Sequence, residues 1–294
     1  MKAPISTHEI PSPDFVARGL IACPICAAAM ADRDGRGLVC PSGHSFDRAR
    51  EGHYNLLAVQ HKASTDPGDS RGMVAARRQF LGANHYVPVA ARTCAVVQQL
   101  VEGKARPCSI LDAGCGEGYY LDAVANASAG GIGFAGIDIS KWAIRAAAKR
   151  SQRIFWAVAS NRHLPFAPAS IDLILSMFGF PLWDAFAAAQ PLGGHVLLAD
   201  PGPDHLIELR SIIYRQVNTT APQSIEAALP AGYRLDGEQR LSFRFRLSSA
   251  AQISELLTMT PHAHRVSSEG RAALAQLTGL SVTADVVFRT LRRS

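Results

Sequence analysis

Three cysteines and one histidine near the N-terminus are spaced like a set of metal ligands. They form the pattern Cys23-x2-Cys26-x13-Cys40-x3-His44. Three thiolates and one imidazole complete the tetrahedral coordination of Zn²⁺ and leave no position for water, which is typical of a structural zinc site. Pro24, and the Pro-Ser-Gly that follows the third cysteine, favour the two tight turns of such a site. The alternative is a chance cluster of buried free cysteines, because the remaining cysteines are scattered and form no disulfide framework.

A second group of residues lies in a glycine-rich turn, Ser109-Ile-Leu-Asp-Ala-Gly-Cys-Gly-Glu-Gly118. Glycine at 114, 116 and 118, after a predicted strand and before a predicted helix, lets the backbone approach a ligand closely. Asp112 precedes the glycines on the strand. Asp138 ends the next strand, where a carboxylate can accept hydrogen bonds from both ribose hydroxyls. Because Tyr119 stands where a dinucleotide fingerprint requires glycine, the set favours S-adenosylmethionine, with a nicotinamide dinucleotide as the alternative.

A third segment, Ala159-Ser-Asn-Arg-His-Leu-Pro-Phe166, follows the third strand of the predicted sheet. In methyltransferases this segment usually offers a carboxylate to the adenine amino group, but here that position is Ser160. We therefore expect the Ser160 hydroxyl, the Asn161 amide or backbone groups to contact the adenine. A simple turn at Leu164-Pro-Phe166 is the alternative.

Short apolar strands and helical patterns alternate after residue 107, which predicts a parallel, doubly wound α/β sheet. The expected strands cover 110–111, 133–137, 155–159, 171–177 and 195–199, with helices at 119–129, 141–149 and 204–217. The alternating runs at 241–247 and 281–291 predict two antiparallel edge strands.

The segment from Ile21 to about Gln60 has only short apolar runs and is too small to form a hydrophobic core without a metal. We expect four parts: a loosely held leader over 1–19, a zinc-binding domain over 20–60, a helical linker over 61–106 with helices at 73–81 and 87–101, and a methyltransferase domain over 107–294. No stretch has the ~18 apolar residues of a membrane span. No signal peptide is expected, and the cysteine usage favours a reducing cytoplasm.

The sequence resembles the RlmA family of 23S rRNA guanine-N1 methyltransferases from about Cys23 to the C-terminus. The motifs that carry the resemblance are Cys23-Pro-Ile-Cys, Cys40-Pro-Ser-Gly-His-Ser-Phe-Asp, Glu51-Gly-His-Tyr-Asn-Leu-Leu, Gln60-His-Lys, Asp66-Pro-Gly-Asp-Ser, Ala76-Arg-Arg, His85-Tyr86, Leu111-Asp-Ala-Gly-Cys-Gly-Glu-Gly-Tyr-Tyr, Pro201-Gly-Pro-Asp-His-Leu and Met259-Thr-Pro. Gln60-His-Lys and Asp66-Pro-Gly-Asp look more like the Gram-negative branch than the branch associated with macrolide resistance.

The resemblance implies a Rossmann-like class I methyltransferase with a mostly parallel seven-stranded sheet and a small N-terminal zinc-ribbon-like domain. It also implies zinc ligands at the four positions above and contacts to S-adenosylmethionine from Tyr86, Gly116, Glu117 and His205. The implied activity is methyl transfer to N1 of a guanine in a 23S rRNA hairpin loop. The segment Ser176-Met-Phe-Gly-Phe-Pro-Leu-Trp183 departs from the family's usual turn beside the target base. Of the implied activity, the identity of the target base is therefore the part that the resemblance supports least.

A polyanionic partner agrees with the formal net charge of +6, since residues 1–110 hold 13 Lys and Arg against 9 Asp and Glu. The basic residues expected to contact phosphates are Arg33, Arg36, Arg48, Arg50, Lys62, Arg71, Arg77 and Arg78. The sequence names no catalytic base and leaves a homodimer open. Two alternatives stand beside the rRNA enzyme: a methyltransferase for another RNA or a small molecule, and a non-catalytic protein that binds zinc, S-adenosylmethionine and RNA.

Overall fold

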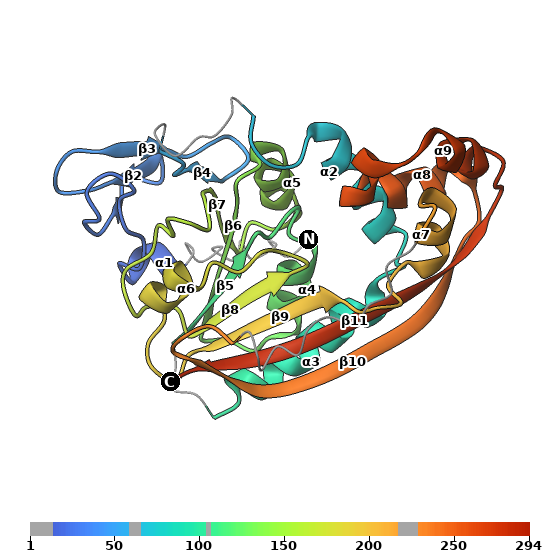
Figure 1. Ribbon diagram of the computed structural model, residues 1–294. Helices are drawn as coiled ribbons and strands as arrows, with labels where there is room; N and C mark the ends of the chain where they lie inside the picture. Colours follow the sequence, from blue (N-terminus) through green and yellow to red (C-terminus); the bar gives the residue numbers. More distant parts are fainter. Residues whose placement is uncertain (1–13, 59–65, 104–106, 217–228) are drawn as a thin grey trace, which may run out of the picture.

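The computed structural model describes residues 14–58, 66–103, 107–216 and 229–294. A small N-terminal module lies at one end of a large sheet, and a group of C-terminal helices lies at the other (Figure 1). The module contains helix α1 (Asp14–Ala17) and an antiparallel three-stranded sheet of β1 (Ala31–Asp32), β2 (Gly37–Val39) and β3 (Ser45–Asp47). The N-terminal module and the C-terminal helices therefore flank the large sheet.

The central sheet has eight strands in the order β10-β11-β9-β8-β5-β6-β7-β4. Its parallel strands are β4 (Tyr54–Asn55), β5 (Cys108–Ala113), β6 (Ile132–Asp138), β7 (Phe155–Val158), β8 (Leu173–Met177) and β9 (His195–Pro201), and its antiparallel strands are β10 (Tyr233–Leu247) and β11 (Leu280–Arg293). The predicted Rossmann-like class is confirmed. The expected number of seven strands is wrong by one, because the N-terminal module contributes β4.

Side chains of successive strand residues enter cores on opposite faces of the sheet, as Ile110 and Leu111 of β5 do. The first core holds residues of α2 (Arg71–Gly82), α3 (Val87–Val101), α4 (Tyr119–Ala127), α5 (Lys141–Arg150), α7 (Ile207–Ile213), α8 (Ala250–Thr258) and α9 (Ser268–Ala275). The second core holds residues of α1, the N-terminal module and α6 (Trp183–Ala189). Both faces are therefore covered, as a parallel sheet requires.

The N-terminal module is joined to the methyltransferase core. Phe15 is fully buried against Phe155 and Phe166, Ile21 forms a β-bridge with Phe166, and Tyr54 pairs with Ala157 on β7. The prediction of a loosely held leader through residue 19 is therefore wrong for α1, while residues 1–13 lie outside the described part. The apolar side chains of the small module gain the core that they cannot build alone.

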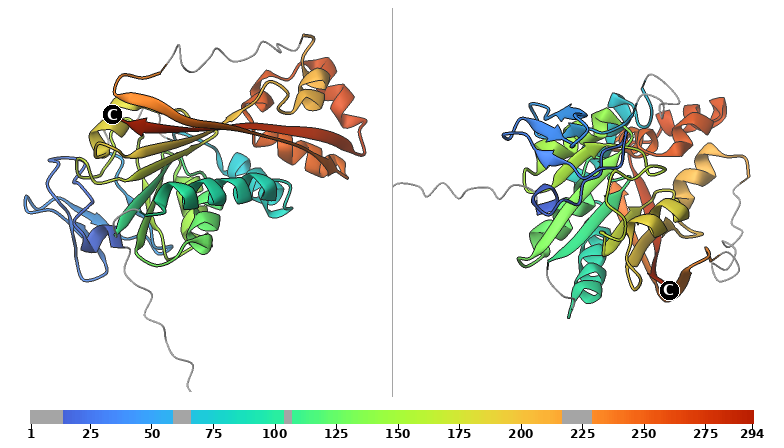
Figure 2. Two further views of the ribbon diagram at one scale, coloured as in Figure 1. Left: turned by 90° about the horizontal axis from the view of Figure 1, so that it is seen from below. Right: turned by 90° about the vertical axis from the view of Figure 1, so that its left-hand side faces the viewer.

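The C-terminal strands form a long two-stranded ribbon that reaches the helices at the far end (Figure 2). In the sequence, α8, the 3₁₀ helix η3 (Pro261–Arg265) and α9 lie between β10 and β11. Because β11 pairs with both β9 and β10, it is an interior strand, and the prediction that it forms an edge is wrong. The helix expected over 204–217 is only the seven residues of α7, and its predicted last residue lies outside the described chain. Among the described helices, none is long and apolar enough to span a membrane.

Candidate active site and metal centre

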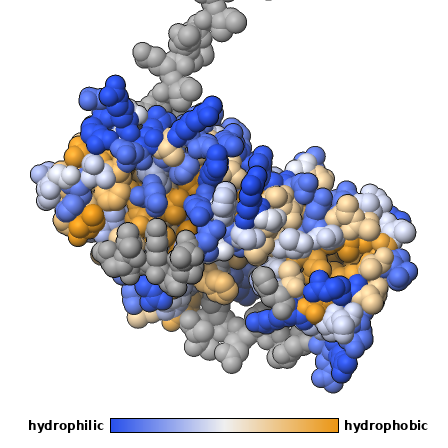
Figure 3. Space-filling model, turned by 90° about the horizontal axis from the view of Figure 1, so that it is seen from above, coloured by the Kyte–Doolittle hydropathy of each residue, from blue (hydrophilic) through white to orange (hydrophobic). Residues whose placement is uncertain are grey.

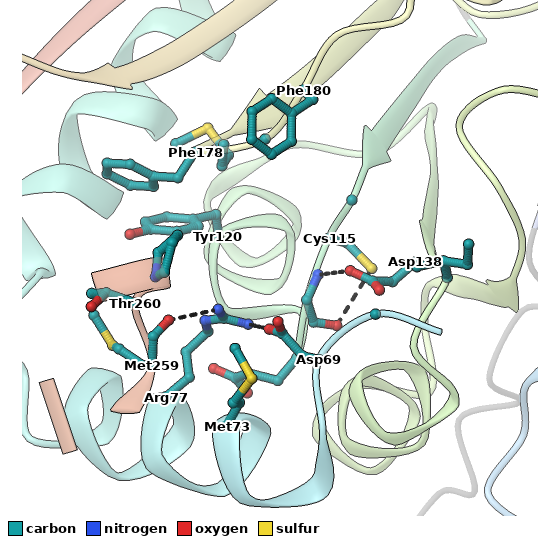
Figure 4. Close-up of a pocket in the computed structure, with 18 of the residues that line it drawn as sticks. Asp69, Met73, Arg77, Cys115, Tyr120, Asp138, Phe178, Phe180, Met259 and Thr260 are labelled. Atoms are coloured by element: carbon teal, nitrogen blue, oxygen red, sulfur yellow. Dashed lines mark hydrogen bonds and ion pairs between the residues drawn. The ribbon is translucent and has the colours of Figure 1, made fainter. Parts of the chain in front are cut away.

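A cavity of about 1230 Å³ opens at the carboxyl ends of the parallel strands. Its floor is formed by the turns after β5, β6, β8 and β9, and α2 and the residues after α8 border it on the other side (Figure 4). Ligands of doubly wound sheets bind at this edge, where the strand order reverses. The cavity exceeds the ~300–1,000 Å³ of a typical small-molecule site. It therefore has room for a cofactor and part of a second substrate.

The turn after β5 has the backbone that its glycines predict. Gly114, Gly116 and Gly118 adopt φ angles of +89°, +55° and +81°, in the left-handed region that side chains disfavour. The Gly116 N–H donates to Asp138 Oδ2 at 2.9 Å, and the Ser140 N–H donates to Asp138 Oδ1 at 2.8 Å. Asp138 therefore joins two loops while it lines the cavity.

Eight of the ten residues expected to bind the cofactor line this one cavity. They are Tyr86, Gly114, Gly116, Glu117, Asp138, Ser160, Asn161 and His205. Gly118 does not line it, because it packs against Trp156: a Cβ there would lie 2.7 Å from the indole ring. Asp112 is also absent from the lining and lies buried below the turn. Both lie beneath the surface of the cavity.

Asp112 has no hydrogen-bond partner for either carboxylate oxygen within the described residues. Burial, and secondarily the nearby Asp138, raise the pKa of Asp112 to about 8. S-adenosylmethionine carries a sulfonium and an ammonium group, so a cation bound above this turn would stabilise the charged carboxylate. The orphaned carboxylate and the left-handed glycines thus fit that cofactor.

Replacing Asp112 with asparagine should stabilise the cofactor-free protein at pH 8. Because folding raises the pKa of the Asp112 carboxyl, this group keeps its proton in the folded state, whereas it releases the proton above about pH 4 in the unfolded state. Asp112 therefore lowers stability progressively as pH rises toward 8. We expect a melting temperature on the order of 5 °C higher at pH 8 and a smaller change at pH 5. Circular dichroism melts of Asp112→Asn, with the exposed Asp34→Asn as control, test this. Destabilisation of the Asp112 variant at pH 8 would contradict it.

Tyr86 and His205 meet inside the cavity although they are far apart in the sequence. The Tyr86 hydroxyl lies 3.3 Å from His205 Nε2, and His205 Nδ1 lies 2.8 Å from the carbonyl oxygen of Asp285. Nδ1 also lies 3.3 Å from the Asp285 N–H, but the shorter contact, to a carbonyl that can only accept, favours a proton on Nδ1, and Nε2 then accepts from Tyr86. Burial lowers the pKa of His205 to about 4. A neutral imidazole with an occupied acceptor is poorly suited to be a general base.

Arg77 has a place in the cavity that sequence reasoning missed. Its guanidinium donates to the Asp69 carboxylate and, at 3.0 Å, to the carbonyl oxygen of Met259 (Figure 4). It therefore joins α2 to the segment before α2 and to the end of α8. Its charge is paired at the cavity, and the expected contact of Arg77 with a phosphate stays a prediction. The motifs Asp66-Pro-Gly-Asp and Ala76-Arg-Arg carry the family resemblance, but their sequence does not reveal the contact between Arg77 and Asp69.

The loop after β8 brings aromatic side chains to the cavity. Phe178 adopts a left-handed φ of +55°, and its ring centroid lies 5.8 Å from His205 and 6.2 Å from Tyr86. Phe180 also lines the cavity but is 84% exposed. Asp200, at the end of β9, lines it as well. None of the three was predicted as a site residue. Phe178 and Phe180 lie in the loop that departs from the family's usual turn, and Asp200 lies on β9, outside that loop.

The four predicted zinc ligands converge in the N-terminal module. Their ligand atoms all lie within 4.8 Å of one another, with 3.4 Å between Cys40 Sγ and His44 Nδ1 and 3.7 Å between Cys26 Sγ and Cys40 Sγ. The Ala27 N–H donates to the Cys23 carbonyl and the Gly43 N–H donates to the Cys40 carbonyl, which closes the two turns. Three thiolates and an imidazole at this spacing fit one tetrahedral Zn²⁺.

Comparison with known proteins supports both parts of the chain. Residues 21–65 match the family model described as "RlmA, N-terminal", and residues 110–211 match that of a methyltransferase domain. The 23S rRNA (guanine(748)-N(1))-methyltransferase of Streptomyces fradiae is 31% identical over 274 residues, which cover 92% of this chain and 95% of that protein.

Two further relatives are provisionally described as 23S rRNA (guanine-N(1)-)-methyltransferases. The protein of Micromonospora griseorubida is 34% identical over 202 residues, covering 64% of this chain and 67% of its own. The protein of Bacillus subtilis is 29% identical over 274 residues, covering 90% and 94%. The resemblance read from the sequence is confirmed at the level of the family, while the assignment to its Gram-negative branch stays a prediction.

Proposed function

The chain belongs to the family of 23S rRNA (guanine-N1)-methyltransferases, and we propose that it transfers a methyl group from S-adenosylmethionine to N1 of a guanine in a 23S rRNA hairpin loop. The observation that carries the proposal is the likeness to the Streptomyces fradiae enzyme over nearly the whole of both chains. The cavity supports it, since glycines and Asp138 border one part and aromatic rings border another. Such an enzyme acts in the cytoplasm, where rRNA is found.

The reaction determines the form of the substrate. N1 lies on the Watson–Crick edge of guanine, so the target must be unpaired or extruded from a helix. The bound cofactor supplies an activated methyl group. The residues proposed to hold the cofactor are Tyr86, Asp138, Ser160, Asn161 and His205, with Asp112 acting on the turn from below. Positioning the two reactants is then the main task of the protein.

A basic pocket of about 410 Å³ supports an RNA partner. Arg36, Arg48 and Arg50 of the N-terminal module line it together with Gln152, which follows α5. Within the described chain none of these arginines forms an ion pair. The Gln152 amide donates to the Glu51 carbonyl at 3.2 Å, which fixes the pocket against the catalytic domain. Hydrophilic residues also cover much of this end of the molecule (Figure 3).

The other arginines of the proposed phosphate-contacting group differ from these three. Arg33 pairs with Asp47, Arg71 lies over the ring of Trp142, and Arg78, although exposed, lies on α2 and does not line the pocket. Lys62 lies outside the described residues. The RNA contact is therefore proposed to centre on the basic pocket.

Replacing all three pocket arginines with alanine should weaken RNA binding in a salt-dependent way. Each lost phosphate contact lowers the slope of log K against log salt by ~0.7 to 0.9, so we expect a slope smaller by about 2. The turnover number at saturating RNA should stay near that of the wild type. Filter binding of 23S rRNA over a salt series measures the slope, with Arg234, Arg246 and Arg271 of the C-terminal region replaced together as control. An unchanged slope in the pocket variant would exclude the contact.

Reverse transcription tests the proposed function directly. N1-methylguanine cannot form a Watson–Crick pair, so the polymerase should stop at one guanine in 23S rRNA from cells that carry the gene. The stop should vanish when the gene is deleted and return when it is restored. If no stop depends on the gene, the substrate is not a guanine N1 of 23S rRNA.

A further inference from the structure

We propose that the ends of β8 and β9 form the subsite for the target guanine, in which Phe180 stacks on the base and Asp200 accepts hydrogen bonds from N1–H and the 2-amino group. Asp200 then takes the N1 proton during methyl transfer. This inference rests on the proposed function and assigns residues to its substrate side.

The two strand ends lie side by side. Met177 pairs with Ala199 in parallel register, and the Phe178 N–H donates to the Ala199 carbonyl at 2.8 Å. Phe178 and Asp200 are therefore neighbours at the point where both strands leave the sheet. Phe178 and Phe180 line the part of the cavity across from Asp69 and Arg77 (Figure 4). The subsite thus belongs to the cavity but not to the turn that is expected to hold the cofactor.

Among the described residues, no aromatic ring stacks on Phe180. Its neighbour Phe178 is half-buried against Tyr86, Tyr120 and His205, whereas Phe180 is 84% exposed at the cavity. A non-glycine residue at a left-handed φ, such as Phe178, costs free energy that surrounding contacts must offset, and such residues cluster at functional sites. An exposed ring at the mouth of a cavity that must admit an unstacked base is suited to stack on it.

Asp200 differs from the other carboxylates at the cavity. Those of Asp69, Glu117 and Asp138 are held by Arg77, by Arg150 and by two backbone N–H groups, respectively. Oε1 of Glu117 has no partner among the described residues, but this side chain is buried, whereas that of Asp200 is 33% exposed. Asp200 has one contact in the described chain, 3.4 Å from its Oδ2 to Arg289 Nη1. Arg289 itself is held more closely by Glu238, at 2.7 Å. Oδ1 therefore remains able to accept.

The chemistry of guanine matches this carboxylate. N1–H and the 2-amino group are adjacent donors, and a carboxylate can accept from both, whereas the other three bases present no such adjacent pair. Burial raises the pKa of Asp200, which makes it a better proton acceptor than an ordinary carboxylate. In the transfer, N1 forms a bond to the methyl carbon as the bond between that carbon and sulfur breaks. The sulfur becomes a neutral thioether, and the N1 proton moves to the Asp200 carboxylate.

Binding measurements without cofactor separate the two roles. The probes are synthetic hairpins that carry guanosine, inosine or an abasic site at the position of the reverse-transcription stop. We expect wild-type protein to bind the guanosine hairpin about tenfold more tightly than the abasic one. Phe180→Ala should lose most of this difference, and Phe180→Tyr should keep it. Leu192→Ala, which removes another exposed side chain at a distant turn, should behave as wild type.

Inosine lacks the 2-amino group and so tests Asp200. The wild type should prefer guanosine over inosine by about tenfold. Asp200→Asn should abolish this preference and slow methyl transfer to guanosine about 100-fold. An Asp200→Asn protein that still prefers guanosine, or a Phe180→Ala protein that still discriminates the abasic site, would overturn the corresponding half of the inference. If wild-type protein methylates no guanine in 23S rRNA, the proposed function fails instead.

Discussion

Cys40→Ser should release the zinc and unfold the N-terminal module. Cys23 and Cys40 are 3% and 4% exposed, so two of the four ligands lie in the interior of the module, whereas Cys26 is exposed and His44 is half-buried. Structural zinc sites contribute ~10–16 kcal/mol of binding free energy to small domains, far more than such a module gains from apolar burial. We expect the zinc content to fall from about one per chain to nearly none. Metal analysis and limited proteolysis, with cleavage concentrated between residues 20 and 55, measure these effects.

At RNA concentrations below saturation, the same variant should lose methyl transfer to 23S rRNA by at least ~100-fold, because the arginine pocket depends on the module. Binding of S-adenosylmethionine, measured by calorimetry, should remain, since the residues proposed to hold the cofactor lie outside the module. Cys94→Ser is the matched control because Cys94 lies in α3, away from the cluster. Zinc that stays bound in the Cys40 variant, or a folded metal-free module, would show that these residues are not structural ligands.

Local patterns made much of the site predictable. The zinc ligands are paired on two short turns, so their spacing in the sequence nearly determines their spacing in space. The glycine turn is also local, and its left-handed backbone follows from the residue type. Asp138 could be placed because parallel neighbouring strands end at the same edge of a sheet. These features depend on few long-range contacts.

Features that depend on long-range packing could not be predicted. Strand β4 has only two residues, too few to show a period, and it pairs with a strand about 100 positions later. Phe15 lies in a proline-rich segment that has no helical pattern, yet the Phe155 and Phe166 rings bury it. One contact between α2 and the end of α8 at the cavity runs from Arg77 to a backbone carbonyl, which no residue type at position 259 reveals.

Removing the Asp138 carboxylate should weaken S-adenosylmethionine binding by at least ~100-fold. Its two oxygens accept backbone N–H groups from Gly116 and Ser140, and it lines the cavity where the ribose is proposed to bind. Asp138→Ala therefore removes the acceptor for the ribose hydroxyls and releases the glycine turn. Each lost hydrogen bond to a charged group costs about 1.5–3 kcal/mol, so two of them account for this factor. Calorimetric titration of the purified variant with S-adenosylmethionine measures the loss.

Asp172→Ala separates the loss of the cofactor contact from the loss of a structural hydrogen bond. Asp172 Oδ2 accepts the Ser109 N–H at 2.8 Å, so this carboxylate also anchors a backbone group of β5, but it does not line the cavity. We expect Asp172→Ala to lower the melting temperature while it keeps the cofactor affinity within about threefold of the wild type. Both variants lose a carboxylate that accepts a backbone N–H, but only Asp138 lines the cavity. Equal affinity of Asp138→Ala and wild-type protein for S-adenosylmethionine would place the cofactor elsewhere in the cavity.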